Sequence, residues 1–287
     1  LASKSVGVGY SALYRQNPSS AVDTYNIAIG YNTGSNVTTG AQNTIVGGLA
    51  ADALTTGGLN VAFGLHALGT DTAGSRSVAL GYSALLTQNF TSATDVYNTG
   101  VGFEAGKAIT TGINNTLIGG LAGDALTDAD YNTIVGYNAL STDVLGSRSV
   151  AVGFEALKTQ NPSSATDMYN VGIGFNAGTS ITTGIKNTLI GGNAGNEIST
   201  GSYNTFVGFS TGTYTVNAAT ATECVIVGAF SDTTAADSSG ANGLGYNIDC
   251  EAGYTTLGSA GNDIRAAHGN VTWATVSDER YKKDIVN

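Results

Sequence analysis

The stretch Ser77 to Arg148 reads SVALGYSALLTQNFTSATDVY, NTGVGFEAGKAITTGIN, NTLIGGLAGDALTDADY and NTIVGYNALSTDVLGSR, and it decides the fold. Each block opens with a five-residue motif: Asn or Ser, two variable residues, an apolar residue and Gly. Blocks start at Ser5, Asn26, Asn43, Asn60, Ser77, Asn98, Asn115, Asn132, Ser149, Asn170, Asn187 and Asn204. One 21-residue block and three 17-residue blocks alternate in this order, so a 72-residue repeat begins at Ser5, Ser77 and Ser149. Such self-similarity indicates a repeat architecture.

The motif predicts a short strand that is apolar on both faces. Successive strand side chains point to opposite sides, so the second and fourth positions share one face and the third position faces the other way. The third position is small in some blocks and large and apolar in others, for example Ala79 and Leu117, but it is never charged. A single solenoid wall can cover only one of these faces, so a second copy of the chain is the simplest cover for the other.

Each motif ends in a Gly, which predicts a sharp bend. An aromatic residue follows in most blocks, for example Tyr82 and Phe103, and the rest of each block is rich in Thr, Gly, Asn, Asp and Ser, which favour loops. The 17-residue period is too short for a pair of helices. The sequence therefore predicts an all-β fold, a parallel β-solenoid or β-roll of about fifteen coils, assembled as a homotrimeric rod.

Composition supports a structured and acidic chain. The 287 residues include 41 Gly and only 2 Pro, 41% are hydrophobic and 11% are charged, and the formal net charge is -10. Strict periodicity with this hydrophobic content argues against a disordered chain. The acidic balance argues against nucleic-acid partners.

SVALG at Ser77 and SVAVG at Ser149 resemble the head repeat of trimeric autotransporter adhesins, a parallel β-roll. The resemblance covers about residues 5 to 208 and implies three rolls packed around one axis. The 17-residue period with 21-residue blocks is longer than that of typical adhesin heads.

The C-terminal segment SDERYKKDI, Ser277 to Ile285, is similar to the opening of the intramolecular chaperone domain of endosialidase-type phage tailspikes and tail fibres. Only Tyr281 departs from the usual pattern, where Leu is common. The resemblance implies a domain that trimerises the shaft and is then removed by self-cleavage beside Ser277 and Asp278. Ser277 would supply the hydroxyl nucleophile, and Lys282 is the candidate base if burial lowers its pKa. An ordinary helix start with Ser277 as N-cap is the alternative.

Four segments follow from these patterns. Residues 1 to 208 are the regular shaft, residues 209 to 258 are degenerate terminal coils, residues 259 to 276 are a connecting stalk, and residues 277 to 287 begin a truncated chaperone. The degenerate blocks begin at Cys224, Ala241 and Tyr254. We expect both ends of the sequence to be cut within longer elements.

The 21-residue blocks carry insertions that recur every fourth coil, and regular loops on a rigid scaffold are frequent binding sites. The candidate receptor-binding residues are the Asn and Asp that the insertions share: Asn17, Asp23, Asn89, Asp95, Asn161 and Asp167. Buttressing of a neighbouring chain is the alternative for these loops.

Other candidate sites are weak. Asp124, Asp128 and Asp130 have calcium-like ligand chemistry but fit solvated loop carboxylates better. His66 and His268 are isolated, so the sequence predicts no metal site and no cofactor. Cys224 and Cys250 do not define a disulfide framework, and buried thiols are an equal alternative to a bridge. No apolar run is long enough to cross a membrane.

The sequence thus predicts a structural virion fibre, a trimeric tail fibre shaft that presents surfaces for host recognition. Its partners are two further copies of itself and a host receptor or glycan, and its location is the virion tail. A bacterial trimeric cell-surface adhesin is the first alternative. A glycan-depolymerising tailspike is a weaker one, because no groove of clustered carboxylates is evident in the sequence. The only enzymatic activity expected is autoproteolysis.

Overall fold

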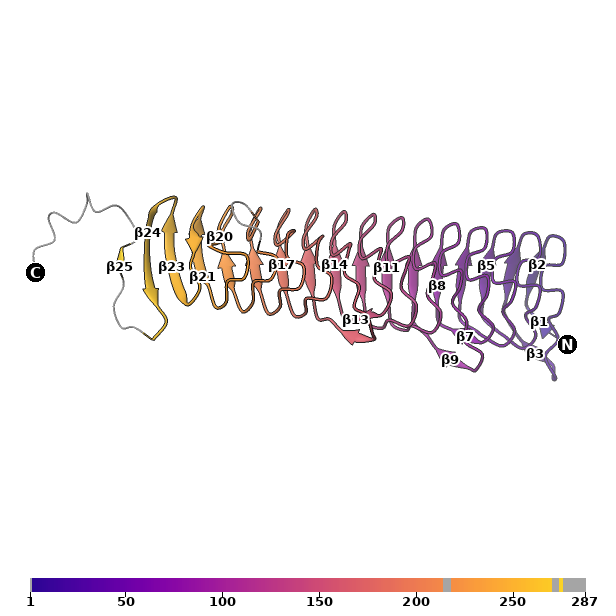
Figure 1. Cartoon of the computed structure of the whole chain (residues 1–287). Coiled ribbons are helices and arrows are strands. Elements are labelled where there is room, and N and C mark those ends of the chain that lie inside the picture. The colour runs from indigo at the N-terminus through magenta and orange to yellow at the C-terminus, as the bar shows by residue number, and fades with distance from the viewer. Residues whose placement is uncertain (1, 214–217, 270–273, 276–287) are drawn as a thin grey trace, which may run out of the picture. The chain divides into compact units, whose positions relative to one another are not determined.

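The computed structural model describes residues 2–213, 218–269 and 274–275, and these form a parallel β-solenoid of about fifteen coils (Figure 1). The described residues contain strands, turns and bends but no helix. The prediction of an all-β parallel solenoid is therefore confirmed. The chain divides into two compact units: Leu1–Val152 with Asn161–Asp167, and Gly153–Gln160 with Met168–Asn287.

In the first unit each coil contributes one three-residue strand to a parallel sheet, and every strand occupies positions two to four of its block. The strands are β2 (Val6–Val8), β4 (Ile27–Ile29), β5 (Thr44–Val46), β6 (Val61–Phe63), β8 (Val78–Leu80), β10 (Thr99–Val101), β11 (Thr116–Ile118), β12 (Thr133–Val135) and β14 (Val150–Val152). Equivalent positions pair across neighbouring coils, as Val61 with Val78 and Val78 with Thr99.

The second unit repeats this stacking and then changes direction. The parallel strands are β16 (Val171–Ile173), β17 (Thr188–Ile190), β18 (Thr205–Val207), β19 (Val225–Val227), β21 (Asn242–Tyr246) and β23 (Tyr254–Ser259). Strand β24 (Asn262–Ala267) is antiparallel to β23, and β25 (Ala274–Thr275) is antiparallel to β24. The antiparallel hairpin therefore lies at the C-terminal edge of the parallel strands.

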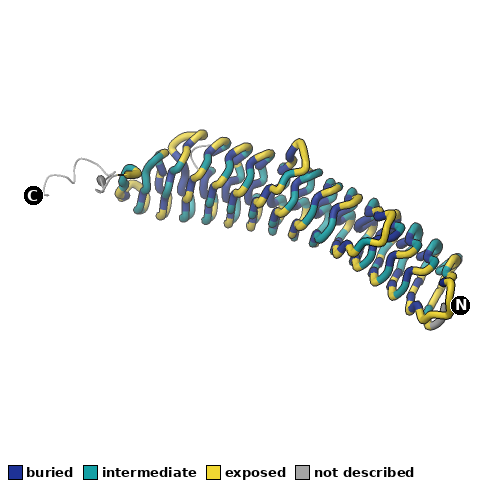
Figure 2. The backbone as a smooth tube through the Cα atoms, turned by 90° about the horizontal axis from the view of Figure 1, so that it is seen from below, coloured by how far each residue is buried: buried dark blue, intermediate teal, exposed yellow. Residues whose placement is uncertain are grey.

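Third-position side chains form the interior of the coils. Ala79, Leu117, Ile134 and Phe206 are fully buried, whereas the second and fourth positions on either side are partly or fully exposed. Figure 2 shows this alternation of buried and exposed residues along the coils. The inward side is thus the third position, and the sheet turns a second, outward apolar face to solvent within the single chain.

The Gly at position five forms a tightly stacked column. Gly102, Gly119 and Gly136 have φ of 141°, 134° and 147°, a region that L side chains rarely adopt. A Cβ added to Gly102 would lie 2.3 Å from the carbonyl oxygen of Gly119, and one added to Gly119 would lie 2.4 Å from that of Gly136. Both the backbone angle and the contact with the next coil therefore require Gly.

Buried Asn side chains at position one join successive coils. Asn115 Nδ2 donates to the Ala129 carbonyl at 2.7 Å, and the Asn132 backbone N–H donates to Asn115 Oδ1 at 3.0 Å. Asn43, Asn60 and Asn187 make the same kinds of contact at their own positions. This Asn ladder satisfies main-chain groups that would otherwise be buried without a partner.

Candidate binding surface on the insertions

The insertions of the 21-residue blocks fold back as two-residue parallel strand pairs. In the first unit these are β1 (Ala2–Ser3) with β3 (Val22–Asp23), β7 (Gly74–Ser75) with β9 (Thr94–Asp95), and β13 (Gly146–Ser147) with β15 (Thr166–Asp167). Figure 1 shows β1, β3, β7, β9 and β13 on the side of the stack away from the narrow loops. The segment Thr91, Ser92 and Ala93 at the tip of one insertion is exposed.

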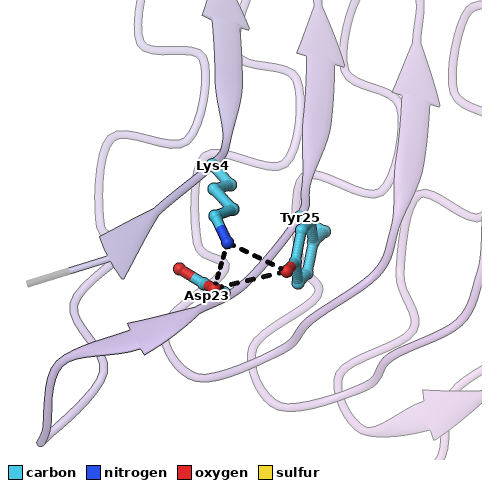
Figure 3. A network of polar contacts seen from close by, with 3 residues as sticks. All are labelled: Lys4, Asp23 and Tyr25. Atoms are coloured by element: carbon cyan, nitrogen blue, oxygen red, sulfur yellow. Dashed lines mark hydrogen bonds and ion pairs between the residues drawn. The ribbon is translucent and has the colours of Figure 1, made fainter.

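Each insertion Asp pairs with a cation that precedes the block. Lys4 Nζ lies 2.7 Å from Asp23 Oδ2 and donates to the Tyr25 hydroxyl at 3.3 Å, while that hydroxyl donates to Asp23 at 3.2 Å (Figure 3). The hydrogen bond to Asp23, and then the one to Tyr25, raises the pKa of Lys4 above its ordinary value. Strand pairing of β3 with β1 brings these residues together, although they are nineteen or more residues apart.

An ion pair with a Tyr ring beside the cation recurs at Arg76 and again at Arg148, where the ring, Tyr131, comes from the preceding coil. Arg76 Nε lies 2.8 Å from Asp95, and its guanidinium carbon lies 5.7 Å from the centre of the Tyr97 ring. Hydrogen bonding and charge attraction by Asp95 raise the pKa of Arg76. Arg148 Nε lies 2.8 Å from Asp167, and its guanidinium carbon is 4.9 Å from the Tyr131 ring. We call each such group of cation, Asp and Tyr an insertion triad.

The structure thus places Asp23, Asp95 and Asp167 in ion pairs on the surface. The three candidate Asn residues of the insertions are exposed: Asn17, Asn89 and Asn161. The Asn17 N–H donates to the Thr38 carbonyl at 3.1 Å, and Asn89 Oδ1 accepts from Thr72 Oγ1 at 3.3 Å. The sequence predicted Asp23, Asp95 and Asp167 as candidate binding residues but did not connect them with the preceding cations or with the half-exposed Tyr rings.

The candidate autocleavage residues Ser277, Asp278 and Lys282 lie outside the described residues. His268, the nearest His in sequence, is exposed after β24. Its Nε2 lies 3.2 Å from Asn242 Nδ2 and 3.3 Å from Thr255 Oγ1, so it bridges β21 and β23.

The described part of the chain was found to contain neither a cluster of metal-ligating side chains nor a membrane-spanning helix. Its residues include no group of three His, Cys, Asp or Glu side chains that could hold a metal ion, and they enclose no pocket. Asp128 accepts from Thr111 Oγ1 at 2.6 Å and Asp130 from the Ile113 N–H at 2.7 Å, so these carboxylates act within the loops. Among the described residues there is also no helix of a length and hydropathy suited to crossing a bilayer.

Cys224 and Cys250 are free thiols, and both are fully buried. Cys224 stands where other blocks have Asn, and its backbone N–H donates to Asn204 Oδ1 at 3.1 Å, so the Asn ladder of the second unit ends there. Burial raises the pKa of the Cys224 thiol, and burial together with Asp249 and Asp232 raises that of Cys250 to about 12. The alternative of buried thiols is therefore the one that the structure supports.

We expect neither thiol to react with an aromatic disulfide reagent at pH 8 while the chain is folded, because the thiolate is the reactive form. In denaturant both thiols should react. A Ser92→Cys variant supplies the control, since residue 92 is exposed and should be modified at once in the folded chain. Rapid modification of the parent under native conditions would contradict this expectation.

Comparison with family models, with curated proteins and with solved structures found no match to this chain.

Proposed function

We propose that this chain is the shaft of a homotrimeric tail fibre or related virion appendage, which carries host-recognition surfaces on its insertions. The observation that carries the proposal is the outward face of the solenoid sheet. In the twelve regular blocks, positions two and four and the position after the Gly hold no charged residue, although 11% of the chain is charged. A solvent-facing surface that avoids charge so strictly favours an interface.

The outward face is apolar and exposed in the single chain. Within the first unit, Val6, Val8, Ile29, Phe63 and Ile118 are 40 to 57% exposed. Beside the strands, aromatic rings stack in pairs across neighbouring coils. Tyr10 and Tyr31 have ring centres 5.4 Å apart, and Tyr82 and Phe103 have ring centres 5.3 Å apart. The two pairs are 72 residues apart in the sequence, so a second copy presents rings at the same intervals.

The exposed area is of the size that a stable interface uses. A fully buried aromatic side chain removes about 150 to 250 Å² from water. The half-exposed outward rings of the first unit therefore offer roughly 600 Å² together, and the aliphatic side chains raise this towards the ~800 Å² per partner of a standard interface. Patches of this size on a monomer mark interaction sites. We propose that further copies of the same chain cover this face, because coils with the same spacing can match one another.

We propose three chains per fibre, and a location on the virion, because SDERYKKDI resembles the start of a trimerising chaperone. In the proposal, Ser277 and Lys282 perform one self-cleavage after the shaft has assembled, and the assembled shaft then persists because its unfolding is slow. Mass spectrometry of the purified protein should detect loss of the piece C-terminal to the cut in the parent and retention of that piece in Ser277→Ala. Retention in both chains would remove the self-cleavage from the proposal.

The insertion triads are the part of the surface that we assign to host recognition. They combine a flat aromatic ring, a carboxylate and a cation at each step of the large repeat, and these groups can stack on and hydrogen-bond to a receptor. Repetition along one side permits several weak contacts to act together.

Charge placed on the outward face tests the assembly. We expect Phe63→Lys combined with Ile118→Lys to convert the trimer into monomer, because both ammonium groups would be buried without a partner. Thr91→Lys combined with Ser92→Lys adds the same charge on an exposed insertion and should leave the trimer intact. Sedimentation velocity distinguishes the species. Trimer in the outward-face variant would show that copies meet through another surface.

A further inference from the structure

A single interior column in the coils changes from apolar to polar at fixed intervals. It consists of the residue eleven positions after the first residue of each block, and all ten members from the second block to the eleventh are fully buried. In order they are Val37, Leu54, Asp71, Gln88, Ile109, Leu126, Asp143, Gln160, Ile181 and Ile198. Two apolar residues are followed by Asp and then Gln, and this order returns with each large repeat.

Asp71 and Gln88 contact each other across neighbouring coils. Gln88 Nε2 donates to Asp71 Oδ2 at 2.6 Å and to Ser77 Oγ at 3.0 Å, and Gln88 Oε1 accepts from Asn98 Nδ2 at 3.0 Å. Asp71 Oδ1 accepts the backbone N–H of Gly74 at 3.0 Å and of Phe90 at 3.1 Å. The bonds from Gln88 Nε2 and from the Phe90 N–H to Asp71 join the two adjacent coils, and Asp71 Oδ2 is paired through the first of them.

The Gln also explains why its block begins with Ser. At position one nine of the twelve regular blocks carry Asn, whose carboxamide enters the ladder, whereas the three 21-residue blocks carry the shorter Ser. The Gln88 carboxamide approaches that position from eleven residues further on. Gln16 Nε2 donates to Ser5 Oγ at 3.1 Å across the same separation, and Gln160 Oε1 accepts from Asn170 Nδ2 at 2.8 Å as Gln88 does from Asn98.

We infer that the Asp and Gln pair is a register pin, which fixes the order in which nearly identical coils stack. Short, Gly-rich strands specify their register weakly, and successive blocks present almost the same strand to a neighbour. A slip by one coil would set Gln88 beside Leu54, or Asp71 beside Ile109, and would leave buried polar groups without partners. A buried polar residue that excludes wrong registers at some cost in stability has a precedent in coiled coils.

The pin predicts that a variant without the pair loses register fidelity. Asp71→Leu combined with Gln88→Leu gives the column the residue type that other coils carry there. This variant should melt below the parent, because the N–H groups of Gly74 and Phe90 and the Asn98 side chain lose the partners that Asp71 and Gln88 supply. We expect the molecules that refold from denaturant to contain a mixture of registers.

Engineered Cys pairs report the register during oxidative refolding. Residues 61 and 78 are Cα partners in β6 and β8, so Val61→Cys with Val78→Cys reports the native order. Thr44→Cys with Val78→Cys reports a slip, because strands two apart are separated by about 9.6 Å, which exceeds the reach of a disulfide. Peptide mapping identifies which Cys residues are joined, including Cys224 and Cys250.

We expect the parent to form only the 61 to 78 bridge and the double-Leu variant to form the 44 to 78 bridge as well. Ile109→Val with Leu126→Val alters the same column without removing the pin, and it should form no slipped bridge. If the double-Leu chain does not fold, Asp71→Thr with Gln88→Val provides the same readout with smaller side chains. A variant that lacks the Asp and Gln pair, folds, and still forms no bridge between residues 44 and 78 would overturn the inference.

Discussion

Replacement of Gly119 by Ala is expected to prevent the chain from folding at 37 °C. The added Cβ would lie 2.4 Å from the carbonyl oxygen of Gly136, and the backbone φ of 134° is one that L side chains rarely adopt. Because the contacting atom is backbone in a stacked coil, it cannot move without shifting the next coil as well. We expect the free energy of unfolding to fall by about 4 kcal/mol or more. Losses of this size are exceptional for single substitutions and arise from mechanisms such as backbone strain and overpacking of a core. Soluble yield and thermal melting measure the loss.

The adjacent Gly120 provides a matched control. Its nearest neighbour is the ring of Tyr137 at 3.3 Å, a side chain that can rotate slightly, and its φ is not in the restricted region. Gly120→Ala should therefore fold with a melting temperature within a few degrees of the parent. Similar behaviour of the two variants would show that the Gly column is not under the restraint described.

Loss of one step of the Asn ladder should have the second largest effect. Asn115→Ala removes the donor to the Ala129 carbonyl and the acceptor of the Asn132 N–H, both in fully buried surroundings. Each buried group left unpaired costs about 1 to 3 kcal/mol, so a total of about 2 to 6 kcal/mol is expected for the two groups. Chemical denaturation followed by circular dichroism gives the difference in the free energy of unfolding.

Two further variants test whether the buried hydrogen bonds of the ladder cause the loss of stability. Asn115→Asp keeps an acceptor of the same shape but loses the donor and buries a charge, so it should be at least as unstable as Asn115→Ala at neutral pH. Asn89→Ala removes an exposed amide that lies outside the ladder, and we expect a loss below about 1 kcal/mol, the range of ordinary surface substitutions. Equal effects of Asn89→Ala and Asn115→Ala would contradict the role given to the ladder.

Periodicity alone was enough to predict the strands and their faces. A motif that is apolar at position four and uncharged at positions two and three predicts a short strand without charge on either face, as Val78, Ala79 and Leu80 illustrate in β8. The bend after the motif followed equally directly from Gly81. These features depend on neighbours within one coil, and such local patterns are what a sequence displays most clearly.

Contacts between coils were harder to predict. Asn at position one was recognised as a marker of the repeat but not as a buried bridge, since an Asn beside turn residues equally suits a loop. The insertion triads escaped notice because Lys4 meets Asp23 only after β3 pairs with β1. The polar column was visible in retrospect, because Asp71 and Gln88 occupy the position that Leu54 and Ile109 hold in other coils.

Native mass spectrometry of the purified chain tests the central claim most directly, because the proposed fibre requires three copies joined through the outward face. We predict a dominant species of about three times the chain mass of 28.8 kDa, at concentrations where the Phe63→Lys/Ile118→Lys variant gives single chains. A parent that remains a folded monomer over the same range would contradict the trimeric shaft and leave the outward face without its proposed partner.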